Sequence, residues 1–148
     1  MSILHYLRSS LPRGRWTWLW IQTAAGLVLT PLEVYGLAAG NVALAEASLL
    51  LWGPFFMLAP WTSVLVTRVQ AGMLPDELAG LAAKVLHRLA ACWLAESIAA
   101  AALSGLSAGR GHSGRALLHA SMVLLAFWCT WLTRAAAAKL RSHTRPRR

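Results

Sequence analysis

The sequence has 148 residues, of which 57% are hydrophobic and 13% charged, with a formal net charge of +9. About a quarter of the residues of an ordinary soluble domain are charged, so this composition excludes that class. Only two charged residues, Glu33 and Glu46, lie between Trp16 and Thr67, and so apolar a stretch must face lipid or other apolar helices. We therefore expect an integral membrane protein.

The basic residues are placed in a way that argues against a nucleic-acid partner. They occur in short clusters beside apolar runs, and no folded domain with a basic face and interleaved aromatic side chains is present. The basic tail, residues 141–148, is typical of the flank of a membrane span and would lie against anionic lipid. The expected surroundings are the lipid bilayer, with no nucleic acid.

Four apolar runs predict an all-α, polytopic helix bundle that forms a single membrane domain over residues 1–148. The predicted spans are residues 16–36, 42–67, 89–108 and 116–133. Three tryptophans (16, 18 and 20) begin the first span and Tyr35 ends it, as expected of rings at the two membrane interfaces. Pro54 and Pro60 lie inside the long second span and should kink it.

Four spans place both termini on the same side of the membrane, and the basic residues say which side. With the termini inside, only Arg110 and Arg115 of the fourteen basic residues would lie outside. Such an asymmetry is a strong positive-inside signal. The chain is therefore predicted to be a multi-pass protein with both termini in the cytoplasm.

Residues 68–88 gather charges between two apolar runs and predict a cytoplasmic connecting helix at about residues 73–88. Pro75 suits a first helical position, and Asp76 and Glu77 then fall in the first turn, where the helix dipole favours acids. Gly72 allows a sharp turn before the helix.

The connecting helix is expected to be amphipathic, to lie at the membrane surface and to run into the third span. One apolar stripe and one polar face recur at helical spacing, the stripe being Leu74, Leu78, Leu81 and Val85 and the face Asp76, Gly80, Lys84 and His87. Such a connector can simply cap the bundle, or it can dock a cytoplasmic partner.

The order of these features resembles a known family. After a basic amphipathic start come Pro31-Leu32 in the first span, a short turn, a long second span, Arg68, Gly72-Met73-Leu74 with acids close behind, and Ala83-Lys84-Val85-Leu86 leading to Trp93. Over roughly residues 1–108 the chain is similar to the haem-exporter permease subunit of cytochrome c maturation (the CcmB family), and more broadly to type-2 ABC exporter permeases. That family has six spans, so the resemblance implies a shortened member.

The resemblance implies a function in the bacterial inner membrane. The chain would be a non-enzymatic permease subunit driven by a separate ATPase subunit at the cytoplasmic face. Haem would be transported or handled rather than stably bound. Further permease chains, cytochrome c maturation subunits or a second copy of this chain in a homodimer would complete the transporter. The residues implied in docking the ATPase are Arg68, Gly72, Leu74, Asp76, Glu77 and Lys84.

Two other functions fit the sequence. One is a non-catalytic accessory subunit of a larger respiratory or assembly complex, and the other is a small proton-coupled transporter. The second would use Glu96, which lies deeper in its span than Glu33 and Glu46 and would serve proton coupling or neutralise a cationic substrate. A glutamate bound to a neighbouring Ser or Thr inside the bundle is the structural alternative.

The histidines and cysteines do not predict a cofactor site. His87 and His119 fall at opposite sides of the predicted membrane, so they cannot bind one haem between them. Cys92 and Cys129 are expected to be a pair of small buried residues rather than a metal or redox motif. No catalytic triad, phosphate loop or metal motif occurs in the sequence.

Overall fold

The computed structural model describes residues 2–41, 43 and 52–144, and their regular structure is entirely α-helical. The all-α prediction is therefore confirmed for this part of the chain. The helices are α1 (Ile3–Ser10), α2 (Arg13–Ala38), α4 (Trp52–Gln70), α5 (Asp76–Gly109) and α6 (Ser113–Thr144).

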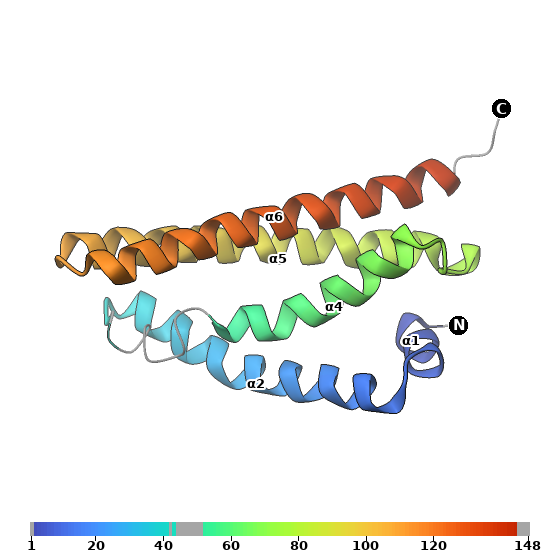
Figure 1. The fold of residues 1–148 in the computed structure, drawn as a ribbon, viewed down its shortest axis with the longest axis horizontal. Helices are drawn as coiled ribbons and strands as arrows, with labels where there is room; N and C mark the ends of the chain where they lie inside the picture. The colour runs from blue at the N-terminus through green and yellow to red at the C-terminus, as the bar shows by residue number, and fades with distance from the viewer. Residues whose placement is uncertain (1, 42, 44–51, 145–148) are drawn as a thin grey trace.

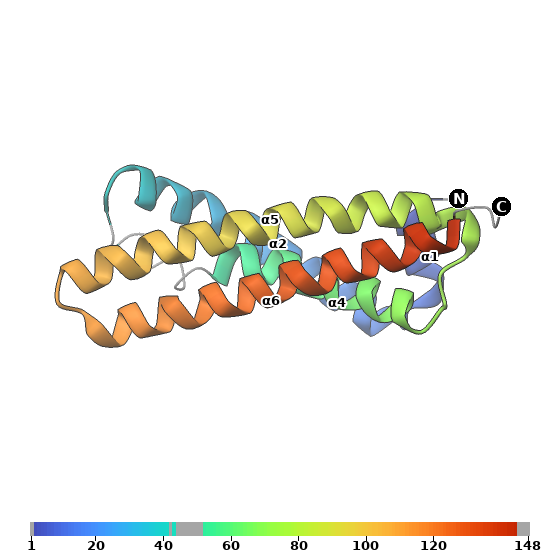
Figure 2. The ribbon, with the colours of Figure 1, turned by 90° about the horizontal axis from the view of Figure 1, so that it is seen from above.

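The long helices form two antiparallel pairs, α2 with α4 and α5 with α6 (Figure 1). Helix α4 joins the two pairs, because it contacts both α5 and α6, whereas α2 packs mainly on α4. The short α1 and the end of α6 lie at one end of the bundle, and the turn between α5 and α6 lies at the other (Figure 2). Helices α5 and α6 thus each connect the two ends.

Small residues bring α5 and α6 together along their whole length. The buried face of α5 includes Ala82, Ala90 and Ala100, and that of α6 includes Ala126 and Ala136. Side chains of this size allow two helix backbones to approach closely. Near the turn, Ser104 Oγ donates to the carbonyl of Ala116 at 2.9 Å, and Ser107 Oγ lies 3.4 Å from Nδ1 of His119. These polar contacts fix the register of the pair.

Two helices of the described chain are long and apolar enough to cross a membrane: α5 over Asp76–Gly109 and α6 over Ser113–Ser142. Of the residues in an apolar 18-residue stretch of each helix, only 33% in α5 and 28% in α6 are buried in the structure. A core helix of a soluble protein hides most of its apolar surface, whereas here Leu117 and Leu124 are each 73% exposed. The exposed apolar surface is what a helix facing lipid would show.

Helix α5 is longer than a membrane span. Its 34 residues extend for about 51 Å, against a hydrocarbon thickness of about 30 Å. Since residues 89–108 carry Glu96 alone among charged residues, the excess length lies at the end where α5 begins. We call this the charged end: α1, residues 65–75, residues 76–88 of α5 and residues 134–144 of α6.

The connecting segment differs from its prediction in the side chains that it buries. Residues 76–88 form the beginning of α5 and run into the predicted third span without a break (Figure 1). The buried stripe is Leu78, Ala79, Ala82 and Leu86, while Leu81 is 45% exposed. The stripe is shifted because the segment packs on α6, α4 and α1 rather than on headgroups. Gly72, with φ +65°, and the acids of the first turn are as predicted.

The predicted second span is only partly visible, because residues 42 and 44–51, including Glu46, lie outside the described residues. Pro60 lies inside α4, which curves without being interrupted (Figure 1). Trp16 and Trp20 were expected at a membrane interface, and they pack on Trp61 of α4. Edge-to-face contacts join all three rings, with centroids 5.6–6.1 Å apart.

Glycine allows α2 and α4 to meet at a single close crossing. A Cβ atom on Gly53 would lie 2.8 Å from the backbone nitrogen of Thr30, and one on Gly26 would lie 2.5 Å from the carbonyl oxygen of Gly53. Backbone atoms cannot move aside as a flexible side chain can. The pairing of α2 with α4 therefore requires glycine at both positions.

We predict that Gly53→Ala destabilises the protein by about 1–3 kcal/mol, because the added methyl group pushes the backbones of α2 and α4 apart. The measurement is the thermal unfolding midpoint of the purified protein in detergent. Gly105→Ala in α5 is the matched control, since its Cβ would meet nothing within 4 Å. The control should leave the midpoint unchanged or raise it. Equal effects of the two substitutions would contradict the close crossing.

Candidate functional site

At the charged end, α1 lies across the turn that joins α4 to α5. Arg68 donates from its guanidinium to the hydroxyl of Tyr6 at 3.2 Å and to the carbonyl of Ser10 at 2.8 Å. Its guanidinium carbon lies 5.7 Å from the centroid of the Tyr6 ring, within the range of a cation–π contact. The Tyr6 hydroxyl donates to the carbonyl of Met73. These contacts, which we call the α1 clasp, hold α1 to the end of α4 and to the turn.

Beneath the α1 clasp lies the largest buried apolar cluster of the described residues. Ile3 and Leu7 of α1 enter it, and Leu7 is fully buried. The other buried members come from α4, α5 and α6: Leu65, Val66, Val69, Leu78, Ala79, Ala82, Leu86, Ala136, Ala137 and Leu140. A closed core of this kind is how a water-exposed domain buries apolar surface. The charged end thus has a core of its own.

The turn between α4 and α5 covers part of this core and exposes polar groups to solvent. Leu74 is half-buried and packs against the cluster, whereas Gly72, Asp76 and Glu77 are exposed. Beside them is a groove of about 270 Å³ whose lining includes Gly72, Leu74, Asp76 and Lys139. Lys139 of α6 donates to the carbonyl of Gln70 at 3.1 Å, which ties the end of α4 to α6. The exposed turn is therefore held from both sides.

The six residues predicted to dock a partner do not form one surface. Gly72, Leu74, Asp76 and Glu77 lie together at the turn, as the sequence predicted. Arg68 points toward α1, where it donates hydrogen bonds to Tyr6 and Ser10, and so it is not part of the exposed turn. Lys84 is exposed two turns further along α5 and lines another groove. Four of the six thus remain as a candidate surface, which we call the turn surface; Gly72, Asp76 and Glu77 are exposed in it and Leu74 is half-buried.

A second groove at the charged end is basic. It has a volume of about 430 Å³ and lies between the beginning of α5 and the end of α6. Its floor contains the small residues Ala79, Gly80 and Ala83, and its other lining residues are Lys84, His87, Arg88 and Arg141. Among the residues that the structure describes, no Asp or Glu lines it. We call it the basic groove.

Polar side chains are buried inside the bundle, between the apolar parts of the helices. Glu96 is 5% exposed and therefore faces the interior of the bundle. One turn away, Trp93 donates from Nε1 to Oγ1 of Thr62 at 2.8 Å and so joins α5 to α4. Buried polar contacts of this kind fix one packing arrangement, because a mispaired polar group in an apolar interior is costly.

His87 and His119 lie far apart, as the sequence indicated. His87 is exposed at the charged end, whereas His119 is buried beside Ser107. Twenty residues of α5 separate His87 from Ser107, or about 30 Å along the helix axis. Within the described residues, no group of three His, Cys, Asp or Glu side chains is arranged to hold a metal ion.

The two cysteines do not form the buried pair that the sequence predicted. Cys129 is half-buried, but Cys92 is exposed, and both are free thiols. Cys92 is exposed because the neighbouring Trp93 occupies the interior position of this turn of α5. Their environments therefore differ, and the prediction of two buried residues is wrong for Cys92.

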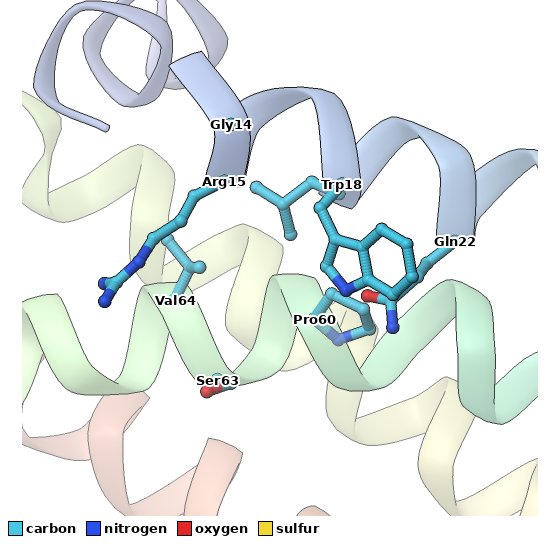
Figure 3. A pocket seen from close by; sticks show the side chains of 8 residues that line it. Gly14, Arg15, Trp18, Gln22, Pro60, Ser63 and Val64 are labelled. Atoms are coloured by element: carbon cyan, nitrogen blue, oxygen red, sulfur yellow. The ribbon is translucent and has the colours of Figure 1, made fainter. Parts of the chain in front are cut away.

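A third groove, of about 630 Å³, lies between α2 and α4 (Figure 3). Arg15 reaches from α2 toward α4 beside Val64, while Trp18 lies nearer Pro60 and Gln22. Trp18 is 59% exposed, compared with 45% for Trp20. This groove has one cation, and apolar walls make up most of its lining.

Sequence reasoning missed Tyr6, whose hydroxyl connects Arg68 with Met73. A signal for α1 does exist: Ser2 caps the helix by accepting from the amide of His5 at 3.2 Å, and Ile3 and Leu7 share one face. The signal does not say where α1 docks, because its partners lie more than sixty residues away.

We predict that Arg68→Gln loosens α1. The substitution removes two charge-assisted hydrogen bonds and a cation–π contact, so the free energy of local opening of α1 should fall by about 1–3 kcal/mol. Hydrogen exchange of the amides of α1, measured by mass spectrometry in detergent, would show the change. Arg8→Gln, in the exposed face of the same helix, is the control. Unchanged exchange in Arg68→Gln would contradict the α1 clasp.

Comparisons with family models, with curated proteins and with solved structures find no match for this chain. The functional interpretation therefore depends on the geometry of the charged end and on the apolar helices.

Proposed function

We propose that this chain is an integral membrane protein with four spans, contributed by α2, α4, α5 and α6. The exposed apolar side chains are the main support. They occur on α2 as well as on α5 and α6, for example Leu27 and Val28 at 59% and 67% exposure. Water would penalise such surfaces, whereas lipid would solvate them.

The positions of the turns support the same topology. Arg110, in the turn between α5 and α6, donates to the carbonyl of Gly40 at the end of α2 at 3.4 Å. The two turns thus lie at one end of the bundle, and the charged end lies at the other (Figure 1). By the positive-inside rule the charged end faces the cytoplasm, and a bacterial inner membrane is the proposed location.

Cysteine labelling tests the four spans. We expect a membrane-impermeant maleimide to label Ala39→Cys and His112→Cys from outside the cell, in a background with Cys92→Ala and Cys129→Ala. Ser9→Cys should be labelled only after the membrane is broken. If only α5 and α6 crossed the membrane, Ala39→Cys would be protected and His112→Cys would not. That result would overturn the four-span topology.

The function proposed for the chain is that of a permease subunit of an ABC-type exporter, with haem as the proposed cargo. The observation that carries it is the turn surface. A coupling element must be exposed, and it must be rigid enough to transmit movement of a partner to the helices in the membrane. Gly72, Asp76 and Glu77 are exposed, and the α1 clasp and the Lys139–Gln70 contact hold the turn from two sides.

The direct continuation of the turn surface into α5 also favours coupling. Because α5 is one unbroken helix from Asp76 to Gly109, a displacement at its first turn is carried along the whole helix. A separate surface helix joined by a flexible loop would lose part of that movement. Helix α2 packs mainly on α4, so much of its surface remains uncovered and could bind a further permease chain or a second copy of this chain.

Charge reversal at the turn surface tests the docking of an ATPase. We expect the tagged chain, purified in mild detergent from its native membranes, to bring with it ATP hydrolysis. Asp76→Lys/Glu77→Lys should lower that hydrolysis about tenfold or more, because like charges placed across an interface cost several kcal/mol.

Arg110→Glu/Arg115→Glu is the control for this experiment, since it reverses two charges at the opposite end of the α5–α6 pair. It should keep the captured hydrolysis. Hydrolysis that survives the reversal at Asp76 and Glu77, in protein that elutes as the wild type does, would exclude docking at the turn surface. Absence of hydrolysis with the wild-type chain would exclude the exporter function itself.

A further inference from the structure

The basic groove brings together cations from two helices. Lys84 and Arg88 come from α5 and Arg141 from α6, around a floor of small residues, and His87 also lines the groove. The nearest acid along α5 is Glu77, seven residues before Lys84 and about 10 Å away along the axis. Asp76 lines the other groove, with Lys139. The described lining of the basic groove therefore carries a net positive charge.

The basic groove also has space for a ligand. A Cβ atom on Gly80 would meet nothing within 4 Å, so the floor is open at this point. Lys84, His87 and Arg88 are all exposed, and a bound anion could reach them without rearrangement of the helices. Permanent cations on a rigid, open surface suit phosphate groups, which Arg binds with two parallel hydrogen bonds.

The position of the groove relative to the membrane surface indicates that the phosphate belongs to a lipid headgroup. Arg88 is the last cation of α5 before residues 89–108, which are long enough to cross the hydrocarbon core of a bilayer. Arg88 would then lie at the level of the lipid headgroups, and Lys84 about 6 Å further out. This step depends on the membrane insertion proposed above, but not on an ATPase.

We propose that the basic groove binds the headgroup of an anionic phospholipid at the cytoplasmic surface, with preference for a lipid that carries two phosphates. The two helices each contribute cations, so two phosphates can be held at once. Basic pockets between membrane helices are known to recognise such headgroups. Binding of one lipid to both α5 and α6 would also join the two helices at the boundary of the membrane.

Native mass spectrometry of the purified protein in detergent tests this proposal. The probes are cardiolipin, phosphatidylglycerol and phosphatidylcholine, each added at the same concentration. We expect cardiolipin to be retained best and phosphatidylcholine least. Lys84→Gln/Arg88→Gln should weaken cardiolipin binding about 30-fold, at roughly tenfold for each 1.4 kcal/mol and about 1 kcal/mol for each cation.

Three further variants or additions make the test specific. Arg8→Gln/Arg13→Gln removes two exposed cations from the same end but outside the basic groove, and it should bind cardiolipin like the wild type. Lys84→Arg/Arg88→Lys keeps the charge and should keep binding. Inorganic pyrophosphate at millimolar concentration should not displace the lipid.

Several outcomes would overturn the proposal. An equal loss in Arg8→Gln/Arg13→Gln would mean that overall charge, rather than the groove, attracts the lipid. Equal retention of phosphatidylcholine by the wild type would mean that phosphate charge is not recognised. Displacement by pyrophosphate would assign the groove to a soluble phosphate. Labelling of Ala39→Cys and His112→Cys, measured separately, shows whether a failure lies in the lipid site or in the proposed topology.

Discussion

The pairing of α5 with α6 is the constraint on which the rest of the structure depends. It is built from small side chains, which allow two helices of 34 and 32 residues to stay in contact over their full length. Because neither helix breaks where the apolar part ends, the pair forms both the interior of the bundle and the support for the charged end. Helix α4 and α1 then pack against a surface that already exists.

The sequence predicts the fold class and the position of the turn surface, since both depend on local patterns. Gly72 does provide the positive φ, and Asp76 and Glu77 do fall in the first turn of a helix. The face of residues 76–88 that is buried could not be predicted in the same way. Hydropathy assigned the stripe of Leu74, Leu78, Leu81 and Val85 to a membrane surface, but the segment has helix neighbours on several sides. Tertiary contacts select Leu78, Ala82 and Leu86 instead.

The inward position of Arg68 shows a second limit of sequence reasoning. A cation at the end of a predicted span satisfies the positive-inside pattern whether it points to solvent, to lipid or into the protein. Its hydrogen bonds to Tyr6 and Ser10 join positions about sixty residues apart, and no local spacing indicates them. The same holds for the basic groove, because Arg141 meets the cations of α5 only through the antiparallel register of α5 and α6. By contrast, the burial of Glu96 follows from its isolation in an apolar stretch.

The α1 clasp has a consequence for the order in which the protein assembles. Tyr6 and Met73 are 67 residues apart, and everything between them belongs to α1, α2, α4 or the segments that join them. During synthesis α1 therefore has no docking partner until the first hairpin and the following turn have left the ribosome. In the proposed four-span topology, its closure then depends on the end of α4 returning to the side of the membrane on which α1 has remained. A chain in which α4 fails to return to that side would leave Ile3 and Leu7 without Leu65, Val66 and Val69, and this exposed apolar helix would distinguish it from a correctly inserted one.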